Sequence, residues 1–244
     1  MLERRRSGSR PGLREDPAKL TVVVEGGGMR GVYVGGMLRA LAIQGLRDSI
    51  DEVVAVSAGA ITSAAMLAGG HEHCVAIYHE DLAGPEFIDV RRMLRGGPLL
   101  SLEFLFDEVM LRRRRMRWEW LDESDIPLVP VATALDDLAG HPLAGCTGPQ
   151  EWRAAMHATA CVPLYAGAPV AFRGRRWVDG FVTDPLPVAI RTGARGSRPS
   201  RASTHSVPIV AWAHISISWF GTKKRKRRSW VSSSAERAKP DSWP

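Results

Sequence analysis

The chain has 244 residues, of which 45% are hydrophobic and 24% are charged, and its formal net charge is +7. These values are ordinary for a globular protein and predict one domain with a sizeable core. No uninterrupted run of about 18 apolar residues occurs, so no transmembrane helix is predicted. The basic N-terminus is followed by Gly, Pro and acidic residues instead of the apolar stretch of a signal peptide, so we expect a cytoplasmic protein.

The positive charge lies at the two ends of the chain. Residues 191–244 carry a net charge of +10 and residues 1–20 carry +3, whereas residues 21–190 carry −6. A mildly acidic body is not typical of a nucleic-acid-binding core, so we expect no specific nucleic-acid partner. The sequence gives no indication of the oligomeric state.

The cysteines are odd in number, widely spaced and without a CxxC pair: Cys74, Cys146 and Cys161. This spacing indicates neither a disulfide framework nor a zinc site. We predict three buried, reduced thiols and no metal site.

Residues 1–19 are polar and contain Gly and Pro, which predicts a disordered, basic N-terminus. Between residues 20 and 192, apolar runs alternate with helical patterns as they do in α/β proteins. The predicted strands are 20–25, 53–56, 128–135, 168–172 and 176–178, and the predicted helices are 32–46, 58–68, 149–159 and one that begins in 186–190. Continuously apolar strands with small-residue helices between them predict an α/β three-layer sandwich, in which helices flank a central, mainly parallel sheet.

The composition changes after about residue 192. Residues 193–208 are rich in Ser, Arg, Gly and Pro, residues 207–220 are apolar, and residues 223–228 are all basic. This mixture is typical of a linker, an apolar strand and a basic tail, and also of translation in a shifted reading frame. We treat 193–244 as an atypical basic tail to the domain formed by 20–192.

A glycine-rich turn follows the first predicted strand: Gly26, Gly27, Gly28, Met29, Arg30 and Gly31. Consecutive glycines expose backbone N–H groups that no side chain covers. The G-x-G-x-x-G spacing also fits a phosphate-binding loop. A dinucleotide site needs an acidic residue at the end of the next strand, and a Walker loop needs Gly-Lys-Ser/Thr. Neither is present, so we interpret the turn as an oxyanion hole.

The second predicted strand ends at Ser57. Its neighbours Ala55, Ala58 and Gly59 are small, and a small-residue helix follows. This is the setting of a nucleophile elbow, in which a sharp strand-to-helix turn presents the serine hydroxyl. A serine hydroxyl becomes a good nucleophile only when a base removes its proton. We therefore predict Ser57 as a nucleophile and look for its base.

The candidate base is Asp179, which directly follows the predicted strand 176–178 and precedes Gly180 and Phe181. An acidic residue at a strand end beside glycine is well placed to project into a site. Asp184, directly before Pro185, fits the alternative role of a helix cap better than Asp179 does.

These motifs, in this order, resemble those of the patatin-like phospholipases, particularly bacterial and cytoplasmic members. The segment 158–165 (ATACVPLY) is also similar to the family's sequence ahead of its aspartate motif, and the resemblance covers about residues 20–192. It implies that Ser57 is the nucleophile and Asp179 its base, in a dyad without histidine. It also implies that the N–H groups of Gly27 and Gly28 form the oxyanion hole.

The resemblance further implies hydrolysis of lipid or phospholipid acyl esters through an acyl-serine intermediate, without a metal or cofactor. Arg30 would support the glycine loop or favour an anionic head group. Two positions depart from the family pattern: Ala55 replaces the first glycine of G-x-S-x-G, and Phe181 replaces a small residue after Asp179-Gly180. Alanine is the smallest replacement, whereas Phe181 is expected to crowd or reshape the approach to Asp179.

Two alternatives remain open from the sequence. A histidine-based triad in the chain order Ser, Asp, His would require His205 or His214, the histidines that follow Asp179. A non-catalytic module would bind an anionic membrane or another acidic surface through Lys223–Arg228, which would make the protein peripheral to a membrane.

Residues 99–120 mix apolar side chains, two tryptophans and the run Arg112–Arg115. Such a segment either lies in a membrane interface or packs on the core with its arginines extended outward. We favour packing on the core.

Overall fold

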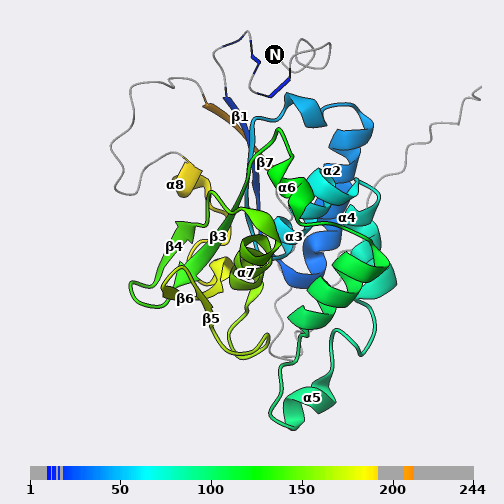
Figure 1. Cartoon of the computed structure of the whole chain (residues 1–244), viewed down its shortest axis with the longest axis vertical. Coiled ribbons are helices and arrows are strands. Elements are labelled where there is room, and N and C mark those ends of the chain that lie inside the picture. Colours follow the sequence, from blue (N-terminus) through cyan, green and yellow to red (C-terminus); the bar gives the residue numbers. More distant parts are fainter. Residues whose placement is uncertain (1–9, 12, 15, 17–18, 192–205, 212–244) are drawn as a thin grey trace, which may run out of the picture. The chain divides into compact units, whose positions relative to one another are not determined.

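The computed structural model describes residues 10–11, 13–14, 16, 19–191 and 206–211. Its strands form one mixed sheet in the order β5-β6-β3-β2-β1-β7, with β4 also paired to β3 (Figure 1). The strands are β1 (Lys19–Val24), β2 (Glu52–Val56), β3 (Leu128–Ala134), β4 (Ala139–Pro142), β5 (Val170–Phe172), β6 (Arg175–Asp179) and β7 (Ser206–Ala211). Pairing is parallel from β7 through β1 and β2 to β3, and antiparallel where β4, β5 and β6 join. The predicted central, mainly parallel sheet is confirmed.

Helices connect the strands. The α-helices are α2 (Gly31–Ile43), α3 (Ala58–Ala64), α4 (His73–Ala76), α5 (Val90–Leu94), α6 (Glu119–Asp122), α7 (Gly148–Ala160) and α8 (Val188–Arg191). The 3₁₀-helical segments are η1 (Gly28–Arg30), η2 (Arg47–Ser49) and η6 (Gly180–Val182). The π-helical segments are η3 (Ala65–Gly69), η4 (Ile77–Asp81) and η5 (Phe104–Arg113). The predicted helix 32–46 ends earlier, at Ile43, and the predicted helix 58–68 is divided into α3 and η3. The sequence analysis did not predict β4, α4, α5 or α6.

Both faces of the sheet are covered. Val22, Val24 and Ala55 belong to the large core cluster that contains residues of α2, α3 and α7. Val54 and Val56 belong to a second cluster, against which Ile190 of α8 packs. Figure 1 shows α2, α3 and α4 on one side of β1 and β2, and α8 on the other. Burial on both faces explains why β1 and β2 are continuously apolar instead of alternating.

The edge beside β1 is occupied by β7. Residues 206–211 pair in parallel with residues 19–24 along the whole of β1. At least the first part of the apolar stretch 207–220 therefore forms a strand, which was one of the interpretations of the sequence. The linker residues 193–205 and the basic run Lys223–Arg228 lie outside the described residues.

The segment 99–120 packs on the core. Four apolar residues of η5 are buried: Leu105, Phe106, Val109 and Met110. On its outer side Arg112 pairs with Glu108, and Arg114 contacts Asp81 at 2.6 Å. The core-packing interpretation is confirmed for these four side chains, whereas Leu111 is 36% exposed.

The three cysteines are free and buried, as the sequence predicted. Within the part of the chain that the structure describes, no helix is both long and apolar enough to cross a bilayer.

Candidate active site

Ser57 lies on a sharp turn between β2 and α3. Its backbone has φ 52° and ψ −126°, a positive φ that non-glycine residues rarely adopt. A Cβ at Gly59 would lie 2.4 Å from the carbonyl oxygen of Glu25, so only glycine lets α3 begin this close to the end of β1. Ala55 is fully buried in β2 and pairs with Val24, so the sheet accommodates its methyl group.

Thr159 of α7 holds the Ser57 backbone in place. The Ser57 N–H donates to Thr159 Oγ1 at 2.9 Å, and the Thr159 hydroxyl donates in turn to the carbonyl oxygen of Val131. Both donors are buried and would be costly to leave unpaired. Sequence reasoning missed this role, although Thr159 lies within the segment 158–165 that resembles the family.

Asp179 accepts a hydrogen bond from Ser57. Ser57 Oγ donates to Asp179 Oδ2 at 2.6 Å, although the two residues are 122 positions apart in the chain. The backbone N–H of Phe181 donates to the other oxygen, Oδ1, at 2.8 Å. Asp179 is 1% exposed, and burial raises the pKa of its carboxyl group from 3.8 to about 6, against the opposing effect of these two hydrogen bonds. A carboxylate with this pKa can accept a proton near neutral pH.

The backbone of Asp179 is fixed by its neighbours in the fold. Its N–H donates to the carbonyl oxygen of Cys161 at 2.9 Å, and its own carbonyl accepts from Thr133 Oγ1 at 3.0 Å. A Cβ at Gly180 would lie 2.3 Å from the carbonyl oxygen of Val131. The glycine after Asp179 is therefore required for β6 to end this close to β3.

The glycine turn lies against Ser57. A Cβ at Gly26 would lie 3.2 Å from the Ser57 Cβ, and Gly28 has φ 56°. Gly26 donates its N–H to the carbonyl oxygen of Pro185. Within the described part of the chain, no hydrogen bond uses the N–H groups of Gly27 or Gly28. Gly27, Gly28 and Ser57 line the same pocket.

Two pockets meet at Ser57. The first, which we call the apolar pocket, has an empty volume of about 400 Å³ and is lined mainly by aliphatic and aromatic side chains: Met29, Ile61, Tyr78, Leu82, Phe87, Leu100, Leu102, Leu105 and Val162. The second, which we call the Arg30 pocket, has an empty volume of about 570 Å³ and is lined by Gly27, Gly28, Arg30, Ser57, Val162, Asp179, Phe181 and Val182. A reacting group at Ser57 would therefore meet apolar side chains in both pockets, and the side chains of Arg30 and Asp179 only in the second.

Phe181 was expected to crowd or reshape the approach to Asp179. Its side chain is 46% exposed and lines the Arg30 pocket, so it does shape that approach. The hydrogen bond between Ser57 and Asp179 is nevertheless formed, and the contact of Phe181 with Asp179 uses the backbone N–H. The side chain at this position therefore does not interrupt the pair.

Tyr78 connects the start of α3 to the start of α2. Its hydroxyl lies 2.7 Å from Thr62 Oγ1 and donates to the carbonyl oxygen of Ala58 at 3.1 Å. A Cβ at Gly31 would lie 2.1 Å from this hydroxyl, so α2 approaches Tyr78 closely. The sequence analysis predicted no helix at Ile77–Asp81, so it gave no indication of this contact.

The histidine-based alternative is not supported by the described residues. Among them, no histidine hydrogen-bonds Ser57 or Asp179. His205 and His214, on which that alternative depends, lie outside the described residues.

The mainly parallel sheet with helices on both faces defines the class of fold, an α/β protein. The family model described as patatin-like phospholipase matches residues 22–191. The chain therefore belongs to the patatin-like phospholipase family, a family of lipid acyl hydrolases.

Two similar proteins extend this comparison. The uncharacterized protein YjjU of Escherichia coli (strain K12) is 27% identical over 184 residues, which cover 73% of this chain and 50% of YjjU. The crystal structure of VipD from Legionella pneumophila superimposes with a TM-score of 0.50 and 14% identity over 80% of this chain and 50% of that one. The likeness to VipD concerns the fold alone. The chain spans about half the length of each of these proteins.

Proposed function

We propose that the protein is a serine acyl hydrolase that cleaves lipid or phospholipid acyl esters, with Ser57 as nucleophile and Asp179 as its base. The observation that carries the proposal is the 2.6 Å hydrogen bond from Ser57 Oγ to a buried carboxylate whose pKa is about 6. A base of this pKa is largely ionised at neutral pH and still accepts a proton readily.

In the first half of the proposed reaction, Asp179 accepts the Ser57 hydroxyl proton as Oγ attacks the acyl carbonyl carbon. The negative charge that develops on the carbonyl oxygen is stabilised by the N–H groups of Gly27 and Gly28, each of which contributes roughly 10²–10³ in rate. The tetrahedral intermediate collapses, the C–O bond to the alcohol breaks, and Asp179 returns the proton to the leaving alcohol.

In the second half, water attacks the acyl-serine ester and gives a proton to Asp179. Collapse of this second intermediate releases the carboxylic acid, and the proton returns to Ser57 Oγ. No metal or cofactor takes part in these steps.

The two pockets suggest how an ester binds. We place the acyl chain in the apolar pocket and the alcohol portion in the Arg30 pocket, because Ser57 lines both. The Arg30 guanidinium favours an alcohol that carries a negative charge, such as a phospholipid head group.

Labelling by a fluorophosphonate probe tests this function. The folded wild type is expected to be labelled at Ser57, Ser57→Ala not at all, and Asp179→Asn much more slowly, because the hydroxyl then lacks its base. Ser124→Ala is the matched control: Ser124 lies outside both pockets, and this variant should be labelled like the wild type. A folded wild type that neither reacts with the probe nor hydrolyses any acyl ester would contradict the proposal and favour a non-catalytic, membrane-binding relative.

A further inference from the structure

A hairpin formed by residues 87–101 carries α5 at its tip. Asp89 donates its backbone N–H to the carbonyl oxygen of Leu99 at 3.0 Å, and Ser101 donates to that of Phe87 at 2.9 Å. Figure 1 shows α5 at the bottom of the view, projecting beyond the helices to which the hairpin is joined. At the base of the hairpin, Phe87 and Leu100 line the apolar pocket. The projection is therefore a direct extension of the pocket wall.

The tip exposes apolar side chains. Val90 is 60% exposed, Met93 43% and Leu94 82%. Their spacing places these three residues on one face of the short helix. A group of exposed, large apolar side chains at the end of a projection is typical of an interaction surface.

Two exposed arginines, Arg91 and Arg95, lie beside this face. Within the described residues, neither Arg91 nor Arg95 forms an ion pair, in contrast to Arg114 of the η5 region, which pairs with two acidic residues. Arg92 donates instead to the carbonyl oxygens of Pro85 and Glu86, which ties the tip to the residues directly before the hairpin. The Asp89 carboxylate caps α5 through the Arg91 N–H. The tip thus combines apolar side chains with two uncompensated positive charges.

A second exposed segment lies next to the hairpin base. Leu164 is 86% exposed and Tyr165 45% exposed, and the Tyr165 carbonyl accepts the N–H of Leu100 at 2.8 Å. Exposed apolar groups thus continue from the tip toward the apolar pocket.

We propose that α5 and Arg95 dock on the surface of a bilayer that contains anionic lipid. Val90, Met93 and Leu94 enter the interface between head groups and acyl chains, and Arg91 and Arg95 contact lipid phosphates. Docking holds the pocket wall formed by Phe87 and Leu100 at the membrane, where lipid esters are found. The purpose of this surface rests on the proposed function, but the binding step itself requires no hydrolysis.

Binding to vesicles of phosphatidylcholine with and without phosphatidylglycerol tests the proposal. The full chain carrying Ser57→Ala is used, so that no lipid is consumed. In this background, Met93→Ser with Leu94→Ser is expected to weaken binding at least about tenfold. Arg91→Glu with Arg95→Glu is expected to weaken it at least about 30-fold on the anionic vesicles and little on the neutral ones.

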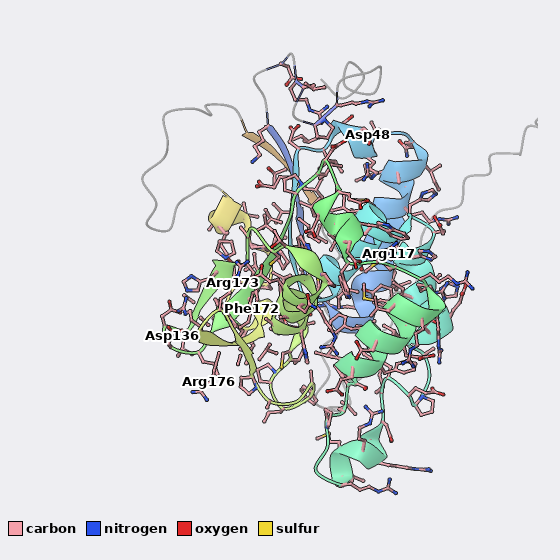
Figure 2. All side chains as sticks on the ribbon, in the orientation of Figure 1. Asp48, Arg117, Asp136, Phe172, Arg173 and Arg176 are labelled. Atoms are coloured by element: carbon pink, nitrogen blue, oxygen red, sulfur yellow. The ribbon has the colours of Figure 1, made fainter. Side chains whose placement is uncertain are left out.

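Matched controls lie elsewhere on the surface. Leu138→Ser removes a leucine that is 68% exposed, and Arg176→Glu reverses an exposed charge on β6 (Figure 2). Both should bind vesicles within about twofold of the parent. The tip variants in the chain with Ser57 intact should hydrolyse a short, water-soluble ester at the wild-type rate, which shows that they are folded.

Vesicle binding by the tip variants equal to that of the parent, or a parent that binds no vesicles, would overturn the docking proposal and leave the proposed hydrolysis standing. If the tip substitutions weaken vesicle binding but the wild type hydrolyses no ester, the docking proposal stands and the proposed function fails.

Discussion

Ser57 lies between two walls that are built in different ways. The wall of the Arg30 pocket is set by backbone: the glycine turn, the end of β6 at Asp179 and the close approach of Gly180 to β3. The wall of the apolar pocket is made of side chains from α3, η4, η5 and the hairpin of residues 87–101.

This difference predicts how each wall responds to substitution. The wall of the Arg30 pocket depends on a few hydrogen bonds and backbone positions, so one changed atom alters the distance between reacting groups. The wall of the apolar pocket acts through the volume and the apolar surface that it offers. A substitution there changes the affinity for the acyl chain by a small factor and does not move the reacting groups.

The largest expected effect is the rate loss of Asp179→Asn. An amide is not a proton acceptor, so kcat should fall by up to about 10⁴-fold. In the wild type, kcat/KM should rise as pH increases through about 6, because Asp179 must be ionised to act as a base. Rates of ester hydrolysis over a series of pH values measure both the loss of kcat in Asp179→Asn and the rise of kcat/KM in the wild type. A flat wild-type profile between about pH 5 and pH 7 would argue against Asp179 as the base.

The same substitution is expected to stabilise the fold. Burial raises the pKa of the Asp179 carboxyl group from 3.8 to about 6. The stability that the fold gains from holding this group protonated is fully present below pH 3.8, and it is lost as the group ionises when pH rises through about 6. At about pH 8 the ionised, buried carboxylate costs about 3 kcal/mol. Denaturant unfolding should therefore give Asp179→Asn a higher free energy of unfolding than the wild type, by up to this amount at about pH 8 and by little at about pH 4. An equal difference at both pH values would exclude titration of Asp179 as the cause.

Gly180→Ala should change the wall of the Arg30 pocket by displacing the backbone alone. The added Cβ would lie 2.3 Å from the Val131 carbonyl oxygen, so β6 must move, at a cost of about 2 kcal/mol. Because Asp179 moves with it, kcat should fall at least about tenfold. Gly36→Ala is the matched control, since its Cβ meets nothing within 4 Å in α2. This control should raise stability by up to about 1 kcal/mol and leave kcat unchanged. Thermal unfolding and ester kinetics of the two variants measure the contrast.

Leu100→Ala should have the smallest effect, because it only enlarges the apolar pocket. We expect kcat/KM for a long-chain acyl ester to fall about tenfold, while that for an acetyl ester stays unchanged. Leu138→Ala, on an exposed turn, serves as the control and should alter neither value. A loss on both esters would show that Leu100 supports Ser57 itself instead of the acyl chain.

The parts of the candidate site that could be predicted are those set by neighbouring residues. Strand β1 with its glycine turn and strand β2 with Ser57 were recognised within one residue of their observed ends, because apolar runs and small residues specify such turns locally. The departures at Ala55 and Phe181 were also visible in the sequence, and Phe181 shapes the approach to Asp179 as expected. Ala55 is accommodated inside the sheet, and Phe181 contributes a backbone hydrogen bond.

The parts that were missed depend on packing between distant segments. Thr159 supports Ser57 across 102 positions, and Tyr78 joins α3 to α2 through a single hydroxyl. The neighbouring sequence does not mark either residue as part of the site, because a single threonine or tyrosine in a helical segment can have many structural roles. The hairpin that carries α5 was missed for a related reason. Its residues follow neither a helical nor an alternating pattern over a sufficient length.

The sequence by itself determined the strand ends, the glycine turn, Ser57 and Asp179, because the backbone conformation at each depends on adjacent small or apolar residues. The tertiary structure alone decided that Ser57 Oγ lies 2.6 Å from a carboxylate 122 residues away, and that burial raises the pKa of this carboxyl group. It also decided which side chains line the apolar pocket and that α5 is exposed. Distances across the sheet and removal from water are properties of packed elements, and no local pattern of residues encodes them.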